Sequence, residues 1–137
     1  MKRINTKIKN TNKTKTKTET KIKNLKTKTH EWIKVENGIA TVGLDVEVKE
    51  AIGEIVHIEL PKVGKKYKKG EEICVLESSK SAFDLYAPLT GKITEVNKRL
   101  FKEIELINKE PERQGWLYKM ELADLKELKD LKEPEKC

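Results

Sequence analysis

The sequence predicts a mainly β domain, a small barrel or sandwich of short strands followed by a C-terminal amphipathic helix. Short apolar runs, many of them alternating, recur along the chain with Gly, Asn and Pro between them. Towards the end the pattern changes, because leucines recur at every third position with Lys and Glu between them. The 137 residues suffice for one domain with a modest core.

The positive charge of the chain is concentrated at its N-terminus. The whole sequence has 30 Lys and Arg against 23 Asp and Glu, a net charge of +7. Residues 1–29 contain ten lysines and one arginine but only the acidic Glu19, so the rest of the chain is mildly acidic. The high isoelectric point is therefore a weak argument for nucleic-acid binding.

Residues 1–28 are predicted to form a disordered tail, because this Lys/Thr/Asn-rich run has few apolar residues to bury. The tail has no apolar segment typical of a secretory signal, and the chain has no membrane-spanning run. A solvated extension is the first interpretation. Polyanion binding and a mitochondrial presequence stay open, although the scarcity of Arg and Ser counts against a presequence.

The first predicted strands form a hairpin. Ile33 and Val35 alternate with polar residues, Asn37-Gly38 is a strong hairpin turn, and residues 39–44 form the returning strand. For the next segment, residues 45–52, the spacing of apolar residues fits either a strand or a short helix.

Leu44, Val46 and Val48 alternate as in a strand. Asp45 could instead cap a short helix whose apolar face contains Val48, Ala51 and Ile52.

A strand over residues 53–60 should then place Val56, Ile58 and Leu60 on one face and Ile55, His57 and Glu59 on the other. Residues 62–70 read as a charged loop, residues 91–97 as a further strand, and the terminal helix contains Leu122, Leu125, Leu128 and Leu131.

The most informative stretch is a predicted hairpin around Lys80. Apolar runs at residues 73–76 and 83–88 flank the small polar residues of its turn. Ser79 and Ser81 stand on either side of Lys80, so nothing bulky shields the amine. Lys80 is therefore a candidate for chemistry rather than an ordinary turn lysine.

A series of motifs resembles the H-protein family of the glycine cleavage system in order and spacing, over roughly residues 29–131. The motifs are His30-Glu31-Trp32, Ala40-Thr41-Val42-Gly43, Ile58-Glu59-Leu60-Pro61, Val63-Gly64, Glu77-Ser78-Ser79-Lys80-Ser81-Ala82, Asp84-Leu85-Tyr86-Ala87-Pro88, Gly91, Glu95-Val96-Asn97, Leu106-Ile107-Asn108 and Gly115-Trp116-Leu117. Biotin-accepting domains place Met on both sides of the lysine, and lipoyl domains of 2-oxoacid dehydrogenases usually place Asp before it. Neither of these two patterns fits the residues around Lys80 as well as the H-protein pattern does.

The resemblance implies a lipoyl carrier with the barrel-sandwich hybrid fold, in which lipoate is amide-linked to Lys80. The domain would span residues 29–133, with residues 134–137 as a C-terminal tail. Such a carrier is not itself an enzyme; in glycine catabolism it shuttles an aminomethyl group from glycine decarboxylase to an aminomethyltransferase. A dihydrolipoyl dehydrogenase reoxidises the arm, and a lipoate ligase or lipoyltransferase attaches it. We expect a cytoplasmic monomer, or a matrix protein if the tail is a presequence, without membrane or nucleic-acid partners.

The resemblance also assigns roles to other residues. Thr29, Glu31 and Asp84 would line a cleft that shields the loaded arm, an alternative being that the two acids are ordinary surface residues. Glu77, Ser79 and Ser81 would present Lys80 to the modifying enzyme. These roles are implied by the family alone.

Two further hypotheses stay open. Residues 44–49 depart from the family pattern, which suggests a lipoylated H-like protein that serves a lipoate relay or another lipoate-dependent process outside glycine cleavage. A polyanion-tethered adaptor that uses the basic tail is a third hypothesis.

Cys74 is predicted to be buried, a disulfide with the terminal Cys137 is not expected, and a reducing compartment fits. No His, Cys or acidic cluster has the spacing of a metal site.

Overall fold

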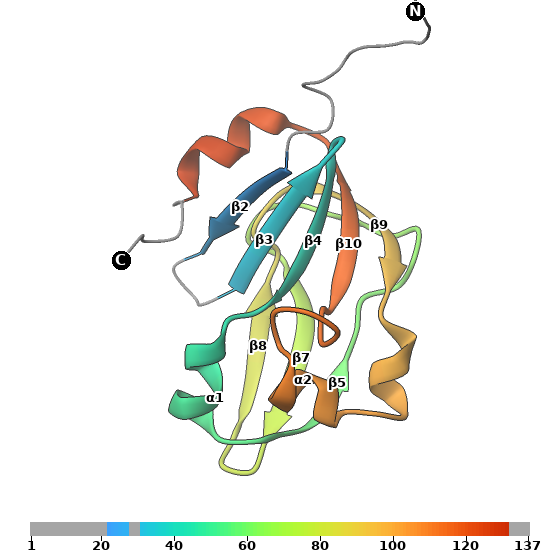
Figure 1. Cartoon of the computed structure of the whole chain (residues 1–137). Helices are drawn as coiled ribbons and strands as arrows, with labels where there is room; N and C mark the ends of the chain where they lie inside the picture. Colours follow the sequence, from blue (N-terminus) through green and yellow to red (C-terminus); the bar gives the residue numbers. More distant parts are fainter. Residues whose placement is uncertain (1–21, 28–30, 132–137) are drawn as a thin grey trace, which may run out of the picture.

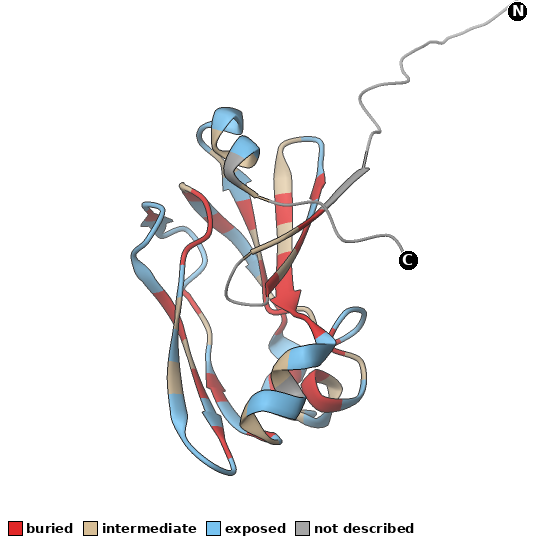
Figure 2. Ribbon diagram, turned by 90° about the vertical axis from the view of Figure 1, so that its left-hand side faces the viewer, coloured by how far each residue is buried: buried red, intermediate tan, exposed pale blue. Residues whose placement is uncertain are grey.

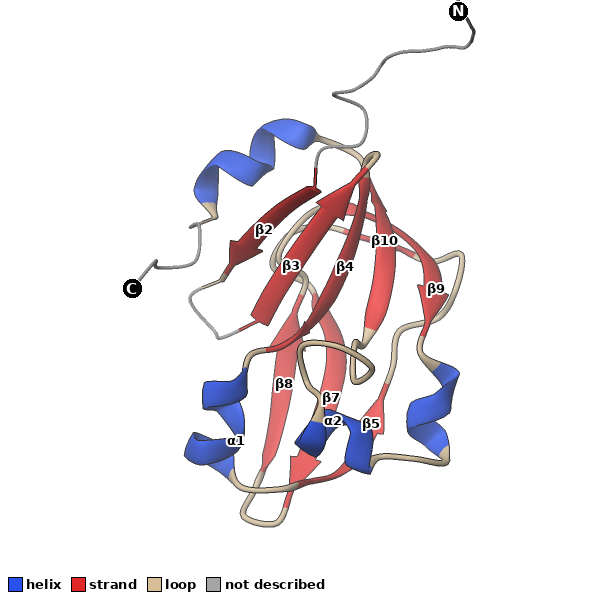
Figure 3. Cartoon of the chain, in the orientation of Figure 1, coloured by secondary structure: helices blue, strands red, loops and turns tan. Residues whose placement is uncertain are grey.

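The computed structural model describes residues 22–27 and 31–131, and within them it is a mainly β structure of two sheets (Figures 1 and 3). The larger sheet has the strand order β2-β3-β4-β10-β9-β6, and the smaller has the order β5-β7-β8. The strands are β2 (Ile22–Lys26), β3 (Glu31–Glu36), β4 (Ile39–Leu44), β5 (Ile55–Glu59), β6 (Lys66–Tyr67), β7 (Glu72–Ser78), β8 (Ala82–Tyr86), β9 (Gly91–Val96) and β10 (Tyr118–Leu122). The helices are α1 (Val46–Ile52), η3 (Lys98–Phe101), α2 (Glu105–Lys109) and η4 (Leu125–Asp130), of which η3 and η4 are 3-10 helices.

The predicted hairpin of β3 and β4 is confirmed. Glu36 pairs with Ile39, so Asn37 and Gly38 form a two-residue turn. Both turn residues have positive φ, 54° and 77° respectively. This is the backbone geometry for which Asn-Gly is favoured, because the turn then matches the twist of the strands.

The ordered part of the chain begins earlier than the sequence analysis placed it. Residues 22–26, assigned there to the tail, form β2 and pair antiparallel with β3. Leu25 is only 4% exposed and belongs to the core, so one well-placed apolar residue contributes to docking this short strand. Thr27 is also described, whereas residues 1–21 and 28 of the predicted tail, and with them its proposed roles, lie outside the described residues, as do residues 132–137.

The ambiguous segment forms helix α1. Asp45 precedes it with a backbone hydrogen bond from Val48 N at 3.2 Å, and its Oδ1 accepts from Glu47 N at 2.8 Å. The capping alternative is therefore the correct one. Val48 and Ile52 pack against the core as predicted, but Ala51, which was assigned to the same apolar face, is exposed.

A bulge overturns the face assignment for β5. The pairing with β7 shifts register between Ile55 and His57, so Ile55 and Ile58 are both buried while Val56 is exposed. The extra residue breaks strict alternation. A second register shift lies between Lys119 and Met120, where β10 pairs with β9, and it accounts for apolar residues of β9 that do not alternate regularly.

Besides β2, four elements were not predicted from the sequence: strands β6 and β10 and helices η3 and α2. Strand β6 interrupts the loop predicted for residues 62–70 and pairs with the start of β9. Strand β10 sits between β4 and β9, and its first residue Tyr118 is buried. Helix α2 packs near β5 and buries Ile107 and Asn108.

The predicted C-terminal amphipathic helix is the short 3-10 helix η4. Leucines at every third position suit a helix with three residues per turn. Leu128 and Leu131 pack against the core, whereas Leu125 is exposed and Leu122 ends β10. The predicted apolar stripe therefore belongs to a strand end, one helix and the residue that follows it.

The core lies between the two sheets, where buried residues run along the strands of both layers (Figure 2). Its most enclosed members are Ile33, Ala40, Val42, Ile55, Leu76, Leu89, Ile93, Leu100, Leu117, Tyr118 and Met120. Figure 1 shows the turn between β7 and β8 at the opposite end of the molecule from η4. This hairpin extends the smaller sheet away from the packed centre.

Candidate functional site

The site is the turn that joins β7 to β8, with Lys80 at its tip. Glu77 pairs with Ala82, and Ser78 N donates to Ser81 O at 2.8 Å. Lys80 is exposed, and so are Ser79 and Ser81 on either side. In the described part of the chain its side chain makes no hydrogen bond or ion pair, so no polar group there engages the amine.

Ser78 organises the turn from inside. Its hydroxyl oxygen accepts hydrogen bonds from Lys80 N and Ser81 N, each at 3.1 Å, and donates to Ser81 O at 3.1 Å. The residue is 8% exposed, although it lies only two positions from the exposed Lys80. A small hydroxyl side chain thus takes the place of regular backbone pairing at the bend.

The segment before β5 holds the turn from the side. Ser79 N donates to Glu54 O at 2.9 Å, and Ile55 pairs with Ser78. Gly53 has φ of +86°, and a Cβ at this position would lie 2.8 Å from Ser79 Oγ. The tip is therefore fastened to the neighbouring strand as well as to its own hairpin.

The three other residues predicted to form the arm cleft are distributed differently. Thr29 lies outside the described residues. Glu31 is 2% exposed and lies on β3 in line with the buried Ile33, so the surface-acid alternative is wrong for Glu31. Thr27, which the sequence analysis did not single out, contacts it: Thr27 Oγ1 donates to Glu31 Oε1 at 2.7 Å and accepts from Glu31 N at 3.0 Å.

Asp84 lies on the other sheet and is exposed. It pairs with Val75, while its neighbours Phe83 and Leu85 pair with the buried Leu76 and Cys74. Asp84 therefore faces away from the core, whereas Glu31 faces into it. The cleft role of these two acids stays a prediction. Glu77 is exposed on the same outer face as Asp84, opposite His57 on β5.

Two titratable groups in the core, the Cys74 thiol and the Tyr118 phenol, stay protonated and neutral at physiological pH. Burial, and then the negative charge of Glu31, raises the pKa of the Cys74 thiol far above its ordinary value. Burial likewise raises the pKa of the Tyr118 phenol, with Cys74, Glu31 and Tyr67 adding to the effect. The prediction that Cys74 is a buried apolar residue is confirmed, since its side chain is 2% exposed.

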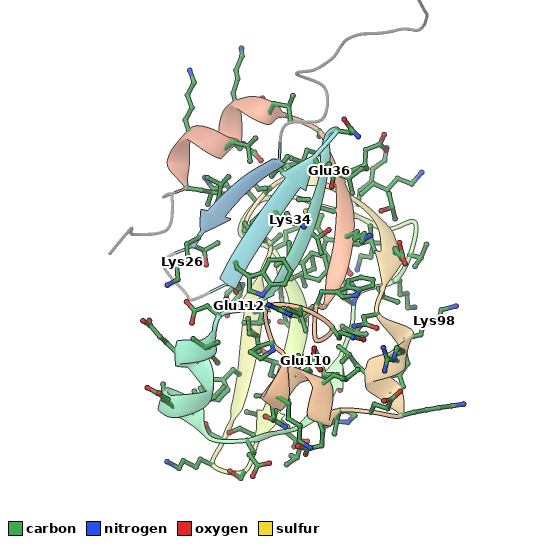
Figure 4. The ribbon with its side chains drawn as sticks, in the orientation of Figure 1. Lys26, Lys34, Glu36, Lys98, Glu110 and Glu112 are labelled. Carbon is green, nitrogen blue, oxygen red and sulfur yellow. The ribbon has the colours of Figure 1, made fainter. Side chains whose placement is uncertain are left out.

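A groove of about 680 Å³ lies on the outer face of the larger sheet, away from Lys80. Its lining includes Trp32, Lys34, Glu112 and Trp116, and Figure 4 shows Lys34 and Glu112 on this face. Trp32 Nε1 donates to Pro111 O at 2.8 Å. Because Lys80 is not part of its lining, the groove is separate from the candidate site.

Within residues 22–27 and 31–131, no three His, Cys, Asp or Glu side chains are placed to hold a metal ion. Over the same residues no helix is long and apolar enough to cross a membrane.

A two-sheet β domain that holds a lysine at the tip of an exposed hairpin is the architecture of a covalent-arm carrier domain. The family model for the glycine cleavage H-protein matches residues 24–137. The chain therefore belongs to the glycine cleavage H-protein family, the lipoyl carrier of the glycine cleavage system, and the resemblance found in the sequence is confirmed.

Individual relatives agree with this assignment. The glycine cleavage system H protein of Thermotoga maritima is 54% identical over 105 residues, which cover 77% of this chain and 85% of that protein. That of Endomicrobium trichonymphae is 47% identical over 107 residues, with 78% and 86% covered. The crystal structure of an H protein from Mycobacterium marinum superposes with a TM-score of 0.69 at 34% identity, covering 73% of this chain and 84% of that one. The predicted barrel-sandwich hybrid fold is thereby confirmed.

Proposed function

We propose that Lys80 is the residue of this chain that carries lipoate, in amide linkage to Nζ, and that the loaded protein carries the aminomethyl group of glycine. The observation that supports it most directly is the exposed, unengaged amine of Lys80 on a turn fixed by Ser78 and Glu54. An acylating enzyme needs a reachable amine with small neighbours, and Ser79 and Ser81 meet that need. The site therefore fits the group that the family carries.

The chain itself supplies position rather than catalysis. A lipoyl group supplies a reducible disulfide at the end of a long arm, which is the chemistry that aminomethyl transfer requires. The hairpin holds the attachment point clear of the domain, so one arm has access to several active sites in turn. Tethering raises the effective concentration of the reactive end at each of them. The role of the chain is thus that of a non-catalytic carrier.

The partners in this proposal are enzymes that must reach the same tip. Glycine decarboxylase would load the arm, an aminomethyltransferase would unload it, and a dihydrolipoyl dehydrogenase would restore it. A lipoate ligase or lipoyltransferase would make the initial attachment. Each of these enzymes has to accommodate a hairpin of about the width of two strands, with the bulk of the domain set back.

Intact-mass measurement after incubation with lipoate, ATP and a lipoate ligase tests the attachment. We expect one lipoyl addition to the wild-type protein and none to Lys80→Arg, which keeps charge and approximate length. Lys62→Arg, at another exposed lysine, is the matched control and should gain one lipoyl group. A wild type that stays unmodified, or a Lys80→Arg protein that gains the group, rules out the proposed site.

A lipoate relay outside glycine cleavage is the second candidate function, and the position of α1 favours considering it. This helix contains most of the segment that departs from the family pattern, and it leads directly into Gly53 and Glu54, which contact the tip. A partner that docks on the tip would therefore approach the C-terminal end of the helix that contains most of the altered segment. Lipoylated protein that accepts the aminomethyl group from glycine decarboxylase supports glycine cleavage, whereas lipoylated protein that never accepts it supports the relay.

A further inference from the structure

The turn around Lys80 is built more rigidly than an exposed loop needs to be. The Ser78 hydroxyl contacts the backbone of both Lys80 and Ser81, and Ser78 N also donates to Ser81 O. These bonds restrict the backbone dihedrals on both sides of Lys80 while its side chain stays free. The flexible part of the site therefore begins beyond the Cα atom of Lys80.

A second anchor comes from outside the hairpin. Glu54 O accepts from Ser79 N, and Gly53 leaves the space that Ser79 Oγ occupies. Any residue with a Cβ at position 53 would meet that oxygen at 2.8 Å and would also be strained at φ of +86°. Gly53 thus lets the tip lie against the segment before β5 without backbone strain and without displacing the Ser79 hydroxyl.

We infer that Ser78 and Gly53 are positioning residues for the modification of Lys80, because the modifying enzyme recognises the fixed backbone of this turn. This inference rests on the proposed function. An enzyme that binds a preformed turn avoids the entropy loss of ordering it, so a loosened turn should be a poorer substrate. A small acylating reagent, in contrast, needs only an exposed amine and should not distinguish the two states.

Ser78→Ala removes the three contacts of the hydroxyl and leaves the amine exposed. We expect kcat/KM for enzymatic lipoylation to fall by about tenfold or more, mainly through a higher KM. Acetylation of Lys80 by a small N-hydroxysuccinimide ester should proceed at the wild-type rate. Ser78→Thr, which keeps the hydroxyl, should restore most of kcat/KM. Thr94→Ala on β9 removes a hydroxyl that donates to Lys119 O and is the control for loss of such a bond away from the turn.

Amide hydrogen exchange supplies the readout that a general loss of stability would not give. In Ser78→Ala, exchange should accelerate at Lys80 and Ser81, whose N–H groups lose their acceptor, and stay unchanged at core positions such as Ile93. Faster exchange at the turn together with wild-type kcat/KM would overturn the inference.

The Gly53 part of the inference has its own test in a double-mutant cycle. Gly53→Ala should lower kcat/KM, and Ser79→Ala in the same protein should recover part of the loss, because it removes the oxygen that the new Cβ meets. Equal losses with and without Ser79→Ala would show that the contact does not matter. Failure of the proposed function is distinguishable from both outcomes, because the wild type would then not be lipoylated at all.

Discussion

The side-chain amide of Asn108 on α2 is bonded to both polar backbone groups of Ile55 on β5. Asn108 Oδ1 accepts from Ile55 N at 2.8 Å, and Asn108 Nδ2 donates to Ile55 O at 3.1 Å. Both residues are buried. Ile55 in turn pairs with Ser78, the residue that shapes the turn, so a chain of specific contacts leads from α2 to Lys80.

Replacing Asn108 by Ala should destabilise the domain by about 2–3 kcal/mol, because a buried N–H and a buried C=O of Ile55 lose their partner together. The midpoint of urea unfolding, followed by circular dichroism, measures this change. Lys109→Ala, at an exposed position of the same helix, is the control and should stay within about 0.5 kcal/mol of wild type. Equal midpoints for the two variants would contradict the role assigned to Asn108.

Local signals in the sequence were sufficient where a residue acts within its own segment. Asn37-Gly38 specified a turn, Asp45 offered a cap, and the apolar runs around Lys80 specified a hairpin. The predicted hairpin singled out Lys80, the motif series implied its role, and the family comparison agrees with that series.

Features that depend on distant partners could not be predicted in this way. Strand β2 is held by the burial of Leu25, and the bulge in β5 is visible only from its register with β7. Strand β10 was missed because its leucine falls in step with the leucines of the next helix. The partner of Glu31 was also missed, because nothing in a Lys/Thr-rich run distinguishes Thr27 from its neighbours.

Gly43→Ala tests the packing of Trp32 on the outer face of the larger sheet. A Cβ at Gly43 would lie 2.5 Å from two carbons of the indole, and the hydrogen bond from Trp32 Nε1 to Pro111 O limits how far the ring can move. We expect a loss of about 1–3 kcal/mol in the free energy of unfolding. In a Trp32→Phe background the same substitution should be less costly, since the smaller ring lacks the contacting atoms. A loss that is equal in both backgrounds would exclude this contact as the cause.

Asp45 has two separable roles that substitutions can distinguish. Its Oδ1 caps α1 by accepting from Glu47 N, and its Oδ2 lies 3.1 Å from Lys26 Nζ on β2. Asp45→Ala should lower stability by about 1–2 kcal/mol through loss of the cap, and Asp45→Asn, which keeps a capping oxygen, should lose less. Thermal unfolding of the three proteins at pH 7 gives this order. If Asn is as destabilising as Ala, the cap is not the main contribution.

The ion pair between Lys26 and Asp45 predicts how the stability difference between wild type and Asp45→Asn depends on pH. The hydrogen bond from Lys26 to Asp45 and the charge of Asp45 raise the pKa of Lys26 above 10.5. The folded protein therefore binds the Lys26 proton more tightly than the unfolded chain does. The resulting gain in stability is complete below the pKa of Lys26 in the unfolded chain, and it is lost as the pH rises through the pKa of Lys26 in the folded protein. The stability difference between wild type and Asp45→Asn should therefore be constant from pH 7 to 9 and shrink only above about pH 10.5. A difference that already falls between pH 7 and 9 would contradict this pairing.

The buried thiol of Cys74 should be chemically silent in the folded protein. Burial and the nearby charge of Glu31 raise its pKa from the ordinary value of 9.0, so the reactive thiolate is not formed near neutral pH. In a Cys137→Ser background Cys74 is the remaining cysteine, and a thiol reagent at pH 8 should label it only after unfolding in urea. Rapid labelling of the folded protein would show that the strand around Cys74 opens readily.

The raised pKa of Cys74 also affects stability at alkaline pH. Above about pH 9 the unfolded chain releases the thiol proton while the folded chain retains it, so the folded state binds more protons and loses stability as pH rises. The slope approaches about 1.4 kcal/mol per pH unit for a single group. Cys74→Ala should remove this slope between pH 9 and 10 although it also creates a small, pH-independent cavity penalty. Urea midpoints at pH 8, 9 and 10 separate the cavity penalty from the proton linkage. The cavity lowers the midpoint equally at each pH. The linkage has little effect at pH 8 and grows as the pH rises past 9.0, the ordinary pKa of the thiol in the unfolded chain.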